Sequence, residues 1–275
     1  MAVKFYQRNV TVNGKTFTTK FFIGDPGDFV VEPTCIANST DTGSNALTWG
    51  SQGVYGTNAS FFGTDGTPSG TEMTALHIYN SKNMVDKNGN KLGGYYNYET
   101  QGDSASAMDY IYYMSSNNSV GVIVKSGLWE PNATIPSMQW GVGGFNMMLS
   151  DTSLSSQSIF DTALKKYYPK IKVAYNTSVS RTAIGYRGSS DKKIVLAAFF
   201  GLDGTATNGP TMYEVRLLMN YLGCSLALCL DGSNLTKISY KQNGVNKGID
   251  NGSRQSWCRI RLTVAAASTT DWTGV

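Results

Sequence analysis

Residues 211–232 read TMYEVRLLMNYLGCSLALCLDG, and this stretch decides the fold. Thr211 and Glu214 have the spacing of a helix capping box, and the apolar residues that follow recur with the period of a helix. Gly223 is typical of a residue that closes a helix, because glycine accepts the left-handed backbone found there. The apolar run Ser225–Leu230 predicts a buried strand. The stretch therefore predicts a helix of about three turns followed by a core strand.

Strand patterns extend from this stretch towards both ends of the chain. The hairpin signal is strong at Asn13-Gly14, which separates two apolar-rich segments. The expected strands are Lys4–Val12, Thr16–Ile23, Tyr110–Met114, Ser119–Lys125, Lys172–Tyr186, Lys193–Phe200 and Trp257–Ala267. One further helix is expected at Ser156–Tyr168, before Pro169.

This pattern of elements predicts the fold class and one structural unit. A strand, the helix after Thr211 and the strand Ser225–Leu230 form a β-α-β unit in a strand-rich chain. We therefore expect an α+β fold, a strand-rich single domain with a mixed β-sheet and a few helices. Residues 1–53 are expected to supply strands and a loop packed on a main domain of residues 54–275, since no low-complexity linker or repeat is present.

The composition excludes several classes of active site. The chain has 275 residues and a single histidine, His77, so it holds neither a two-histidine metal site nor an HExxH helix. No GxSxG sequence accompanies His77, which we expect to be a partly buried core residue of a strand. Only 15% of the residues are charged. Any chemistry therefore falls to carboxylates, arginine, lysine, hydroxyls, amides and backbone N–H groups.

Charge and hydropathy narrow the possible partners. The formal net charge is +4, and lysine and arginine occur singly or in pairs, which argues against a nucleic-acid polymer as partner. No apolar run is long enough to span a membrane, and the N-terminus lacks the apolar region of a signal peptide. We expect a bacterial cytoplasmic or phage-associated protein, or an extracellular one if a leader has been removed. No cofactor is expected, although Asp103, Asp109 and Asp203 could contribute to a divalent-cation site.

Asp231 is the first candidate for a functional carboxylate. It directly follows the strand Ser225–Leu230, and acidic residues at the end of a buried strand tend to face the cleft at that edge of the sheet. The alternative is that Asp231-Gly232 is only a turn. The spacing alone favours neither interpretation.

Four segments, taken in order, resemble one family, the phosphodiester glycosidases. They are Asn58-Ala59-Ser60-Phe61-Phe62, Val142-Gly143-Gly144, Arg181-Thr182-Ala183-Ile184-Gly185 and Leu230-Asp231-Gly232. The first is similar to the Asn-Gly-Gly-Phe-Phe of the family, and Val142-Gly143-Gly144 resembles its central Gly-Gly turn. The third matches its Arg-Thr-Ala-Ile-Gly, and the last lies where its Leu-Asp-Gly-Gly-Gly-Ser is expected. The resemblance covers roughly residues 54–264 and includes a late arginine, at Arg254.

The resemblance implies a set of site residues. Asp231 and Glu214 are the candidate catalytic carboxylates. The candidate substrate-binding residues are Asn58, Gly143, Gly144, Arg181, Thr182, Gly232, Ser233, Asn234 and Arg254. The chain departs from the family where Ala59-Ser60 replace two glycines and where Ser233-Asn234-Leu235 follow Asp231-Gly232. Side chains in a glycine-rich turn narrow or reshape the approach of a ligand to the backbone.

The chemistry of these residue types agrees with the implied reaction. Arg181 offers a planar, permanently charged fork for phosphate oxygens, and its alternative is an ordinary strand arginine on a solvated face. Asp231 is suited to act as nucleophile, base or charge stabiliser at an anomeric carbon. Glu214 is better suited to cap its own helix than to catalyse. Asn58 and the Gly143-Gly144 backbone are expected to orient sugar or phosphate groups, unless Asn58 only satisfies its own loop.

The resemblance therefore predicts a hydrolase that cleaves the sugar–phosphate bond of a glycosyl-1-phosphodiester, either a small N-acetylglucosamine-1-phosphodiester or a surface glycopolymer. The alternative is a non-catalytic or weakly catalytic protein, phage-encoded in one version, that sequesters a phosphodiester or nucleotide-like ligand. The replaced glycine-rich turn after Asp231 motivates this alternative. A third interpretation, from the Ser-, Thr-, Asn- and Gly-rich composition, is a structural virion or surface protein.

Overall fold

The structure, a computed structural model, describes residues 3–33, 46–64, 73–76, 78–80, 108–123, 138–169, 171, 173–205, 207–250, 256 and 258–263. The helices are α1 (Ala46–Ser51), α3 (Gln157–Tyr167), α4 (Gly188–Asp191) and α5 (Met212–Tyr221), with short 3-10 turns η1 (Pro26–Asp28) and η3 (Ser233–Leu235). The strands are β1 (Lys4–Val12), β2 (Lys15–Gly24), β3 (Phe29–Pro33), β4 (Gly56–Asn58), β5 (Phe62–Thr64), β6 (Met73–Leu76), β7 (Ile78–Asn80), β8 (Asp109–Met114), β9 (Ser119–Ile123), β10 (Met138–Asn146), β11 (Arg181–Tyr186), β12 (Ile194–Phe200), β13 (Leu226–Cys229), β14 (Lys237–Gln242), β15 (Val245–Asp250) and β16 (Cys258–Leu262).

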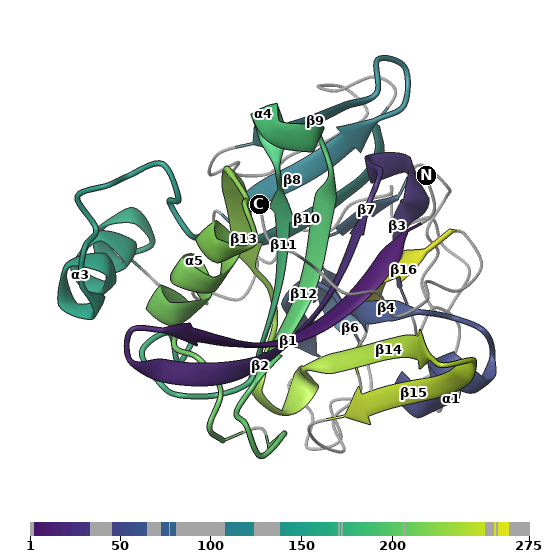
Figure 1. The fold of residues 1–275 in the computed structure, drawn as a ribbon. Coiled ribbons are helices and arrows are strands. Elements are labelled where there is room, and N and C mark those ends of the chain that lie inside the picture. Colours follow the sequence, from purple (N-terminus) through teal and green to yellow (C-terminus); the bar gives the residue numbers. More distant parts are fainter. Residues whose placement is uncertain are drawn as a thin grey trace.

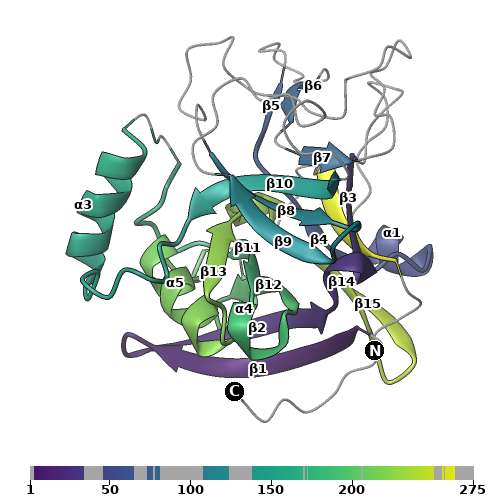
Figure 2. The same ribbon diagram turned by 90° about the horizontal axis from the view of Figure 1, so that it is seen from above.

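The strands form two main sheets and one separate pair. The larger sheet has nine strands in the order β1-β2-β12-β11-β13-β10-β8-β9, and β7 also pairs with β10. The smaller sheet has five strands in the order β15-β14-β4-β16-β3, while β5 pairs with β6. Figure 2 shows the larger sheet curling from β1 and β2 round to β8 and β9.

Every strand pairing in the described part of the chain is antiparallel. The two main sheets confirm the strand-rich class. The antiparallel pairing shows that the expectation of a mixed sheet is wrong for the described residues. The reason lies in β11, which pairs with β12 on one side and with β13 on the other. The strands β12 and β13, which flank α5 in the sequence, run parallel to each other. They are not neighbours in the sheet, because β11 lies between them and pairs with both.

Local sequence explains the first hairpin and the helix α5. The turn of the hairpin uses Asn13 and Gly14, both with a left-handed backbone (φ 50° and 73°), as a two-residue turn between twisted strands requires. The helix α5 begins with the expected capping box of Thr211 and Glu214 and is followed by Gly223 at φ 77°. Both elements form where their turn and cap residues predict them.

Two apolar cores lie on opposite faces of the larger sheet. One face packs against α3 and α5, with Phe160 from α3 and Leu218 from α5 in this core. The other face packs against the smaller sheet, where Ile238 and Ile260 meet Leu196 of β12. Figure 1 shows the two helices on one side of the sheet and β14 and β15 on the other. Because β12 lies between both layers, all seven of its residues are buried.

The N-terminal segment takes part in both sheets. The strand β2 pairs with β12 in the larger sheet, and β3 pairs with β16 in the smaller one. A boundary at residue 53 stays a prediction. His77 lies outside the described residues, so its expected place in the core stays a prediction as well. No helix in the described part of the chain is long and apolar enough to cross a membrane.

Most expected strands are confirmed, with one correction. The pairs β1–β2 and β8–β9 and the last strand, β16, all form at the predicted places. The predicted strand Lys172–Tyr186, however, begins only at Arg181, as β11. Residues 173–180 make turns instead, including a hydrogen bond from Thr177 N to Ala174 O. The carbonyls of Ala174 and Thr177 in these turns accept hydrogen bonds from the Arg181 side chain.

Candidate active site

The predicted motif segments meet where the chain leaves β13. Asn58, the last residue of β4, donates from its Nδ2 to the main-chain oxygen of Asp231 (2.7 Å). Thr182 on β11 donates from its Oγ1 to Asn58 Oδ1 (2.7 Å), and its carbonyl accepts from Leu230 N (2.8 Å). The main-chain N of Asp231 donates to Ala59 O (3.3 Å). Segments more than 100 residues apart in sequence are thus joined by direct hydrogen bonds around Asp231.

Gly143 and Gly144 belong to the same assembly through β10. The carbonyl of Gly143 accepts a hydrogen bond from Ser60 Oγ (2.5 Å), so it is already occupied by the chain. A Cβ atom on Gly144 would lie 2.6 Å from the main-chain oxygen of Cys229. Gly144 is therefore required for the close approach of β10 to β13. The backbone of these glycines holds the strands together, and its role in orienting a ligand stays a prediction.

The turn after Asp231 is tied to the residue before β11. Gly232 N donates to Asp231 Oδ1 (2.8 Å), which orients the carboxylate. Ser233 N donates to Ser180 O (2.7 Å), and Ser180 Oγ donates to Ser233 O (2.8 Å). A Cβ atom on Gly232 would lie 2.8 Å from Ser180 O, so glycine is needed there for close contact. Asn234 follows on the same short turn, η3.

Ser233 has a left-handed backbone, with φ at 60°. Glycine adopts this conformation freely, whereas other residues do so at a cost of about 1–2 kcal/mol. Glycine is also the residue that the family resemblance places here. The chain therefore keeps the backbone shape of a glycine-rich turn but adds a side chain, which is half-buried beside Asp231.

Arg181 is almost completely buried, with 4% of its surface exposed. Its Nε donates to Pro210 O (3.3 Å), and its Nη2 donates to the carbonyls of Ala174 and Thr177. Burial lowers the pKa of the guanidinium, while the Cys229 thiol and the Asp231 carboxylate oppose this effect. The Arg181 side chain packs against the Gly232 backbone, since a Cβ on Gly232 would lie 3.4 Å from Arg181 Cδ.

The acceptors of Arg181 are neutral carbonyls, so its charge has no hydrogen-bonded carboxylate among the described residues. The guanidinium has five N–H donors in total. Its Nη1 has no hydrogen-bond partner in the described parts of the chain. The predicted solvated-face alternative is therefore wrong, because Arg181 is a buried cation whose Nε and Nη2 donate to main-chain carbonyls of two turns.

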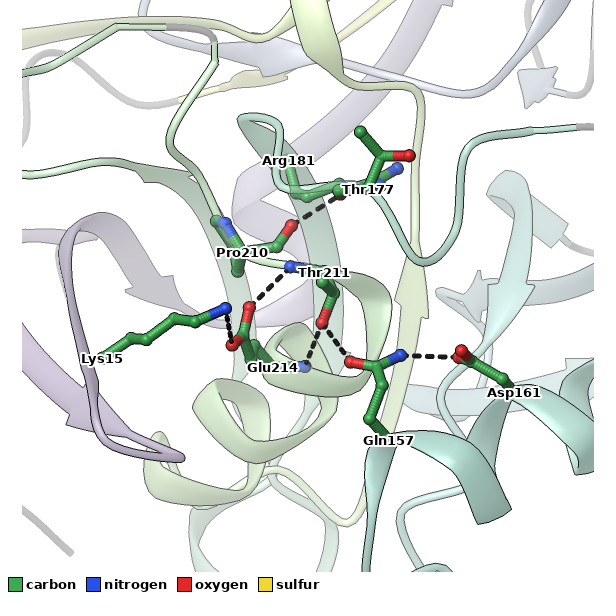
Figure 3. A network of polar contacts seen from close by, with 8 residues as sticks. All are labelled: Lys15, Gln157, Asp161, Thr177, Arg181, Pro210, Thr211 and Glu214. Carbon is green, nitrogen blue, oxygen red and sulfur yellow. Dashed lines mark hydrogen bonds and ion pairs between the residues drawn. The ribbon is translucent and has the colours of Figure 1, made fainter.

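Glu214 caps α5, as the sequence spacing allowed. Its Oε2 accepts from Thr211 N (2.8 Å), and its Oε1 lies 2.9 Å from Lys15 Nζ. The Thr211 hydroxyl accepts from Glu214 N and donates to Gln157 Oε1 on α3 (2.7 Å). Figure 3 shows this network next to the bond between Arg181 and Pro210. Both carboxylate oxygens are engaged and 1% of the side chain is exposed, so the structure shows Glu214 as the cap of α5, and its catalytic role stays a prediction.

The predicted late arginine and the possible divalent-cation site receive no support from the described residues. Arg254 lies outside them, as does Asp103. Asp109 is buried on β8, where it accepts hydrogen bonds from Asn146 Nδ2 (2.7 Å) and from Tyr167 OH. Asp203 accepts hydrogen bonds within its own turn. In the part of the chain that the structure describes, no group of three or more His, Cys, Asp or Glu residues could hold a metal ion.

Sequence reasoning missed several groups that shape the site. Ser180 fixes the Asp231 turn, and its only sequence signal is its place directly before the Arg-Thr motif. Lys237 N donates to Asn58 Oδ1 (2.9 Å), and the carbonyls of Ala174 and Pro210 bind Arg181. These are main-chain groups, which every residue carries, so no residue pattern announces them.

Solved structures show the same fold. The catalytic domain of zebrafish N-acetylglucosamine-1-phosphodiester alpha-N-acetylglucosaminidase, auto-inhibited by its pro-peptide, is similar with a TM-score of 0.57 at 11% identity, over 95% of this chain and 82% of that one. A hypothetical protein from Synechocystis has a TM-score of 0.51 at 14% identity, covering 93% of this chain and 61% of that one. A putative exported protein from Burkholderia pseudomallei has a TM-score of 0.50 at 14% identity, covering 90% of this chain and 74% of that one. At these identities the likeness concerns the fold alone.

Sequence comparison carries the assignment further. No curated protein matches the chain in sequence. The model of the phosphodiester glycosidase family, however, matches residues 51–257, which include Asn58, Arg181 and Asp231. This range spans well over half of the chain and contains the four segments that meet around Asp231. The chain belongs to the phosphodiester glycosidase family.

Proposed function

We propose that the protein hydrolyses the bond between the anomeric carbon of a sugar and the phosphate of a glycosyl-1-phosphodiester. The observation that carries the proposal is the hydrogen-bonded assembly around Asp231, next to the buried Arg181. A fixed cation and a carboxylate are the two groups that such a substrate requires, since one end of the scissile bond is an anion and the other develops positive charge.

Arg181 is the phosphate-binding group in this proposal. Its fork is held by Pro210 O and Thr177 O, so little side-chain entropy remains to be lost when the ligand binds. The donors of Nη1 are then available to a phosphate oxygen. Because the acceptors already bound are neutral dipoles, the charge of the guanidinium remains available to attract an anion.

Asp231 is the catalytic carboxylate. The bond between the anomeric carbon and the bridging phosphate oxygen breaks, and that oxygen leaves on a phosphate monoester. Either Asp231 takes the proton of the attacking water, or it first bonds to the anomeric carbon and water then displaces it; both routes end with a hydroxyl on the sugar. A phosphate monoester is a stable anion, so its departure needs little help from a general acid. This agrees with a site in which Glu214 is engaged as a cap.

The test is a panel of sugar-1-phosphodiesters, small and polymeric, incubated with the protein and followed by mass spectrometry. The wild type should release free sugar and phosphate monoester, and Asp231→Asn should abolish this. Arg181→Lys should raise KM, because the ammonium group does not reproduce the fork. The matched control is Asp151→Asn, an exposed aspartate in the turn before α3, and it should retain activity. Full turnover by Asp231→Asn would falsify the assignment.

One observation favours a second function, the binding of a phosphodiester or nucleotide-like ligand without cleavage. Ser233 adds a half-buried side chain where the family resemblance has glycine, while the turn keeps its left-handed backbone. Such a side chain reshapes the approach to Asp231. Calorimetry on the same panel, followed by mass spectrometry of the calorimeter contents, separates the two functions. Intact ligand after prolonged incubation supports binding alone, and product supports hydrolysis.

A further inference from the structure

We propose that Asn58 and Thr182 are positioning residues, which set the place of the Asp231 carboxylate through its main chain and do not bind substrate. This inference rests on the proposed hydrolysis at Asp231. It assigns both residues a role different from the substrate contact that their motifs suggest. Three hydrogen bonds that meet at one side-chain amide support it.

The amide of Asn58 has one orientation that satisfies its neighbours. Its Oδ1 accepts two hydrogen bonds, from Thr182 Oγ1 (2.7 Å) and from Lys237 N (2.9 Å). Rotating the amide by 180° would bring its NH2 group against the Lys237 N–H, which donates and does not accept. The two donors therefore hold Oδ1 on their side, and Nδ2 must face the main-chain oxygen of Asp231 (2.7 Å).

Both main-chain groups of Asp231 are held by the end of β4 and the residue after it. Its carbonyl accepts from Asn58 Nδ2, and its N–H donates to Ala59 O (3.3 Å). The carboxylate is in turn oriented by Gly232 N, which donates to Oδ1 (2.8 Å). Because the main chain of Asp231 is held in place, its carboxylate starts from a fixed position. Thr182 contributes indirectly, since its hydrogen bond holds the Asn58 amide that binds the Asp231 carbonyl.

Burial together with hydrogen bonding to the chain argues against direct substrate contact by Asn58 and Thr182, whereas Arg181, also buried, keeps Nη1 donors without a partner among the described residues. Asn58 has 1% of its surface exposed and Thr182 has none. Each of the hydrogen bonds at the Asn58 amide also goes to the chain itself. In this proposal these side chains act on the reaction through Asp231, and a carboxylate displaced by about 1 Å is enough to slow a reaction about a hundredfold.

The test compares variants that remove one or all of the hydrogen bonds at the Asn58 amide. Asn58→Leu removes all three bonds and could unfold the turn. Thr182→Val is nearly isosteric and removes only the bond that orients the amide, while Thr182→Ser restores the hydroxyl. The control is Thr19→Val on β2, another fully buried threonine, whose hydroxyl has no hydrogen-bond partner among the described residues. Amide hydrogen exchange at residues 231–233 and steady-state kinetics, corrected for the folded fraction by circular dichroism, are the readouts.

We expect Thr182→Val to speed exchange at residues 231–233 and to lower kcat about tenfold to a hundredfold at nearly constant KM. Thr182→Ser should recover most of kcat, and Thr19→Val should change neither readout. Faster exchange with unchanged kcat, or a rise in KM alone, would overturn the positioning role. A wild type that cleaves no sugar-1-phosphodiester overturns the proposed function instead, so the two failures are distinguishable.

Discussion

Lys15, at the start of β2, forms an ion pair with Glu214, at the start of α5, with 2.9 Å between Nζ and Oε1. The lysine is 55% exposed, whereas the glutamate is 1% exposed. The hairpin lies before residue 51, where the family match begins. A residue outside the matched range therefore compensates a buried charge inside it, and the N-terminal hairpin is part of the unit that supports the site.

Glu214→Gln separates capping from catalysis. Glutamine keeps an oxygen that can accept from Thr211 N but loses the charge that pairs with Lys15. We expect the free energy of unfolding to fall by about 1–2 kcal/mol, because the cap is weakened and the ion pair is lost. The rate per folded molecule should be unchanged. Urea denaturation and the sugar-release assay check the two values.

Lys15→Met is the companion variant, since it removes the partner and leaves the cap intact. It should lower stability at least as much as Glu214→Gln does, because it leaves the buried Glu214 carboxylate without its cationic partner. Loss of turnover in Glu214→Gln, with a normal fold and normal stability, would return Glu214 to a catalytic role.

Arg181→Lys is expected to destabilise the protein although it keeps the positive charge. A lysine cannot donate at once to Pro210 O and to the carbonyls of Ala174 and Thr177, which leaves buried acceptors without a donor. We expect a loss of about 2–4 kcal/mol in the free energy of unfolding by urea. Arg259→Lys, at a half-buried ion pair with Glu32, is the matched control and should cost about 1 kcal/mol or less. Equal losses of unfolding free energy in the two variants would contradict the role of Arg181 in holding these buried carbonyls.

The sequence predicts the parts of this molecule that local chemistry controls. Residues near each other in the chain determine the capping box at Thr211, the turn at Asn13-Gly14 and the end of α5 just before Gly223. The meeting of the Asn58, Arg181 and Asp231 segments was also predictable, because their order and spacing match one family.

The antiparallel pairing and the bonding roles within the site depend on contacts between distant segments. Nothing in Arg181-Thr182-Ala183 indicates that β11 enters between β12 and β13. In the same way, Arg181 and Asn58 are recognisable as polar motif residues, but their acceptors and donors are mostly main-chain groups brought by other strands. A side chain predicted to contact ligand can therefore be engaged by the protein instead.

Ser233→Gly should stabilise the protein. The left-handed backbone at Ser233 (φ 60°) costs a residue with a side chain about 1–2 kcal/mol, and glycine removes this strain while increasing the entropy of the unfolded chain. The expected net gain is about 0.5–1 kcal/mol in the free energy of unfolding by urea. Ser233→Ala, which keeps the strain, serves as the control and should bring no gain. Destabilisation by the glycine variant would show that the Ser233 side chain contributes contacts that outweigh the strain.

Lys20→Met should change how stability depends on pH. Lys20 lies between the two sheets with 5% of its surface exposed, and its Nζ donates to Gln7 Oε1 and to Tyr240 OH (3.1 Å). Burial lowers its pKa from 10.5 to about 8. Between these two values the unfolded chain binds more protons than the folded one, so this residue makes stability rise as pH increases.

Methionine removes that dependence along with the cost of burying a charge. We expect Lys20→Met to be more stable than the wild type at pH 7, by at most about 3 kcal/mol, and this advantage to narrow by about 2 kcal/mol at pH 9.5. Urea denaturation at the two pH values measures both quantities, and Lys4→Met controls for the loss of one lysine from the same hairpin. An advantage that stays constant with pH would mean that Lys20 titrates alike in the folded and unfolded chains, and that its burial leaves its charge fully solvated.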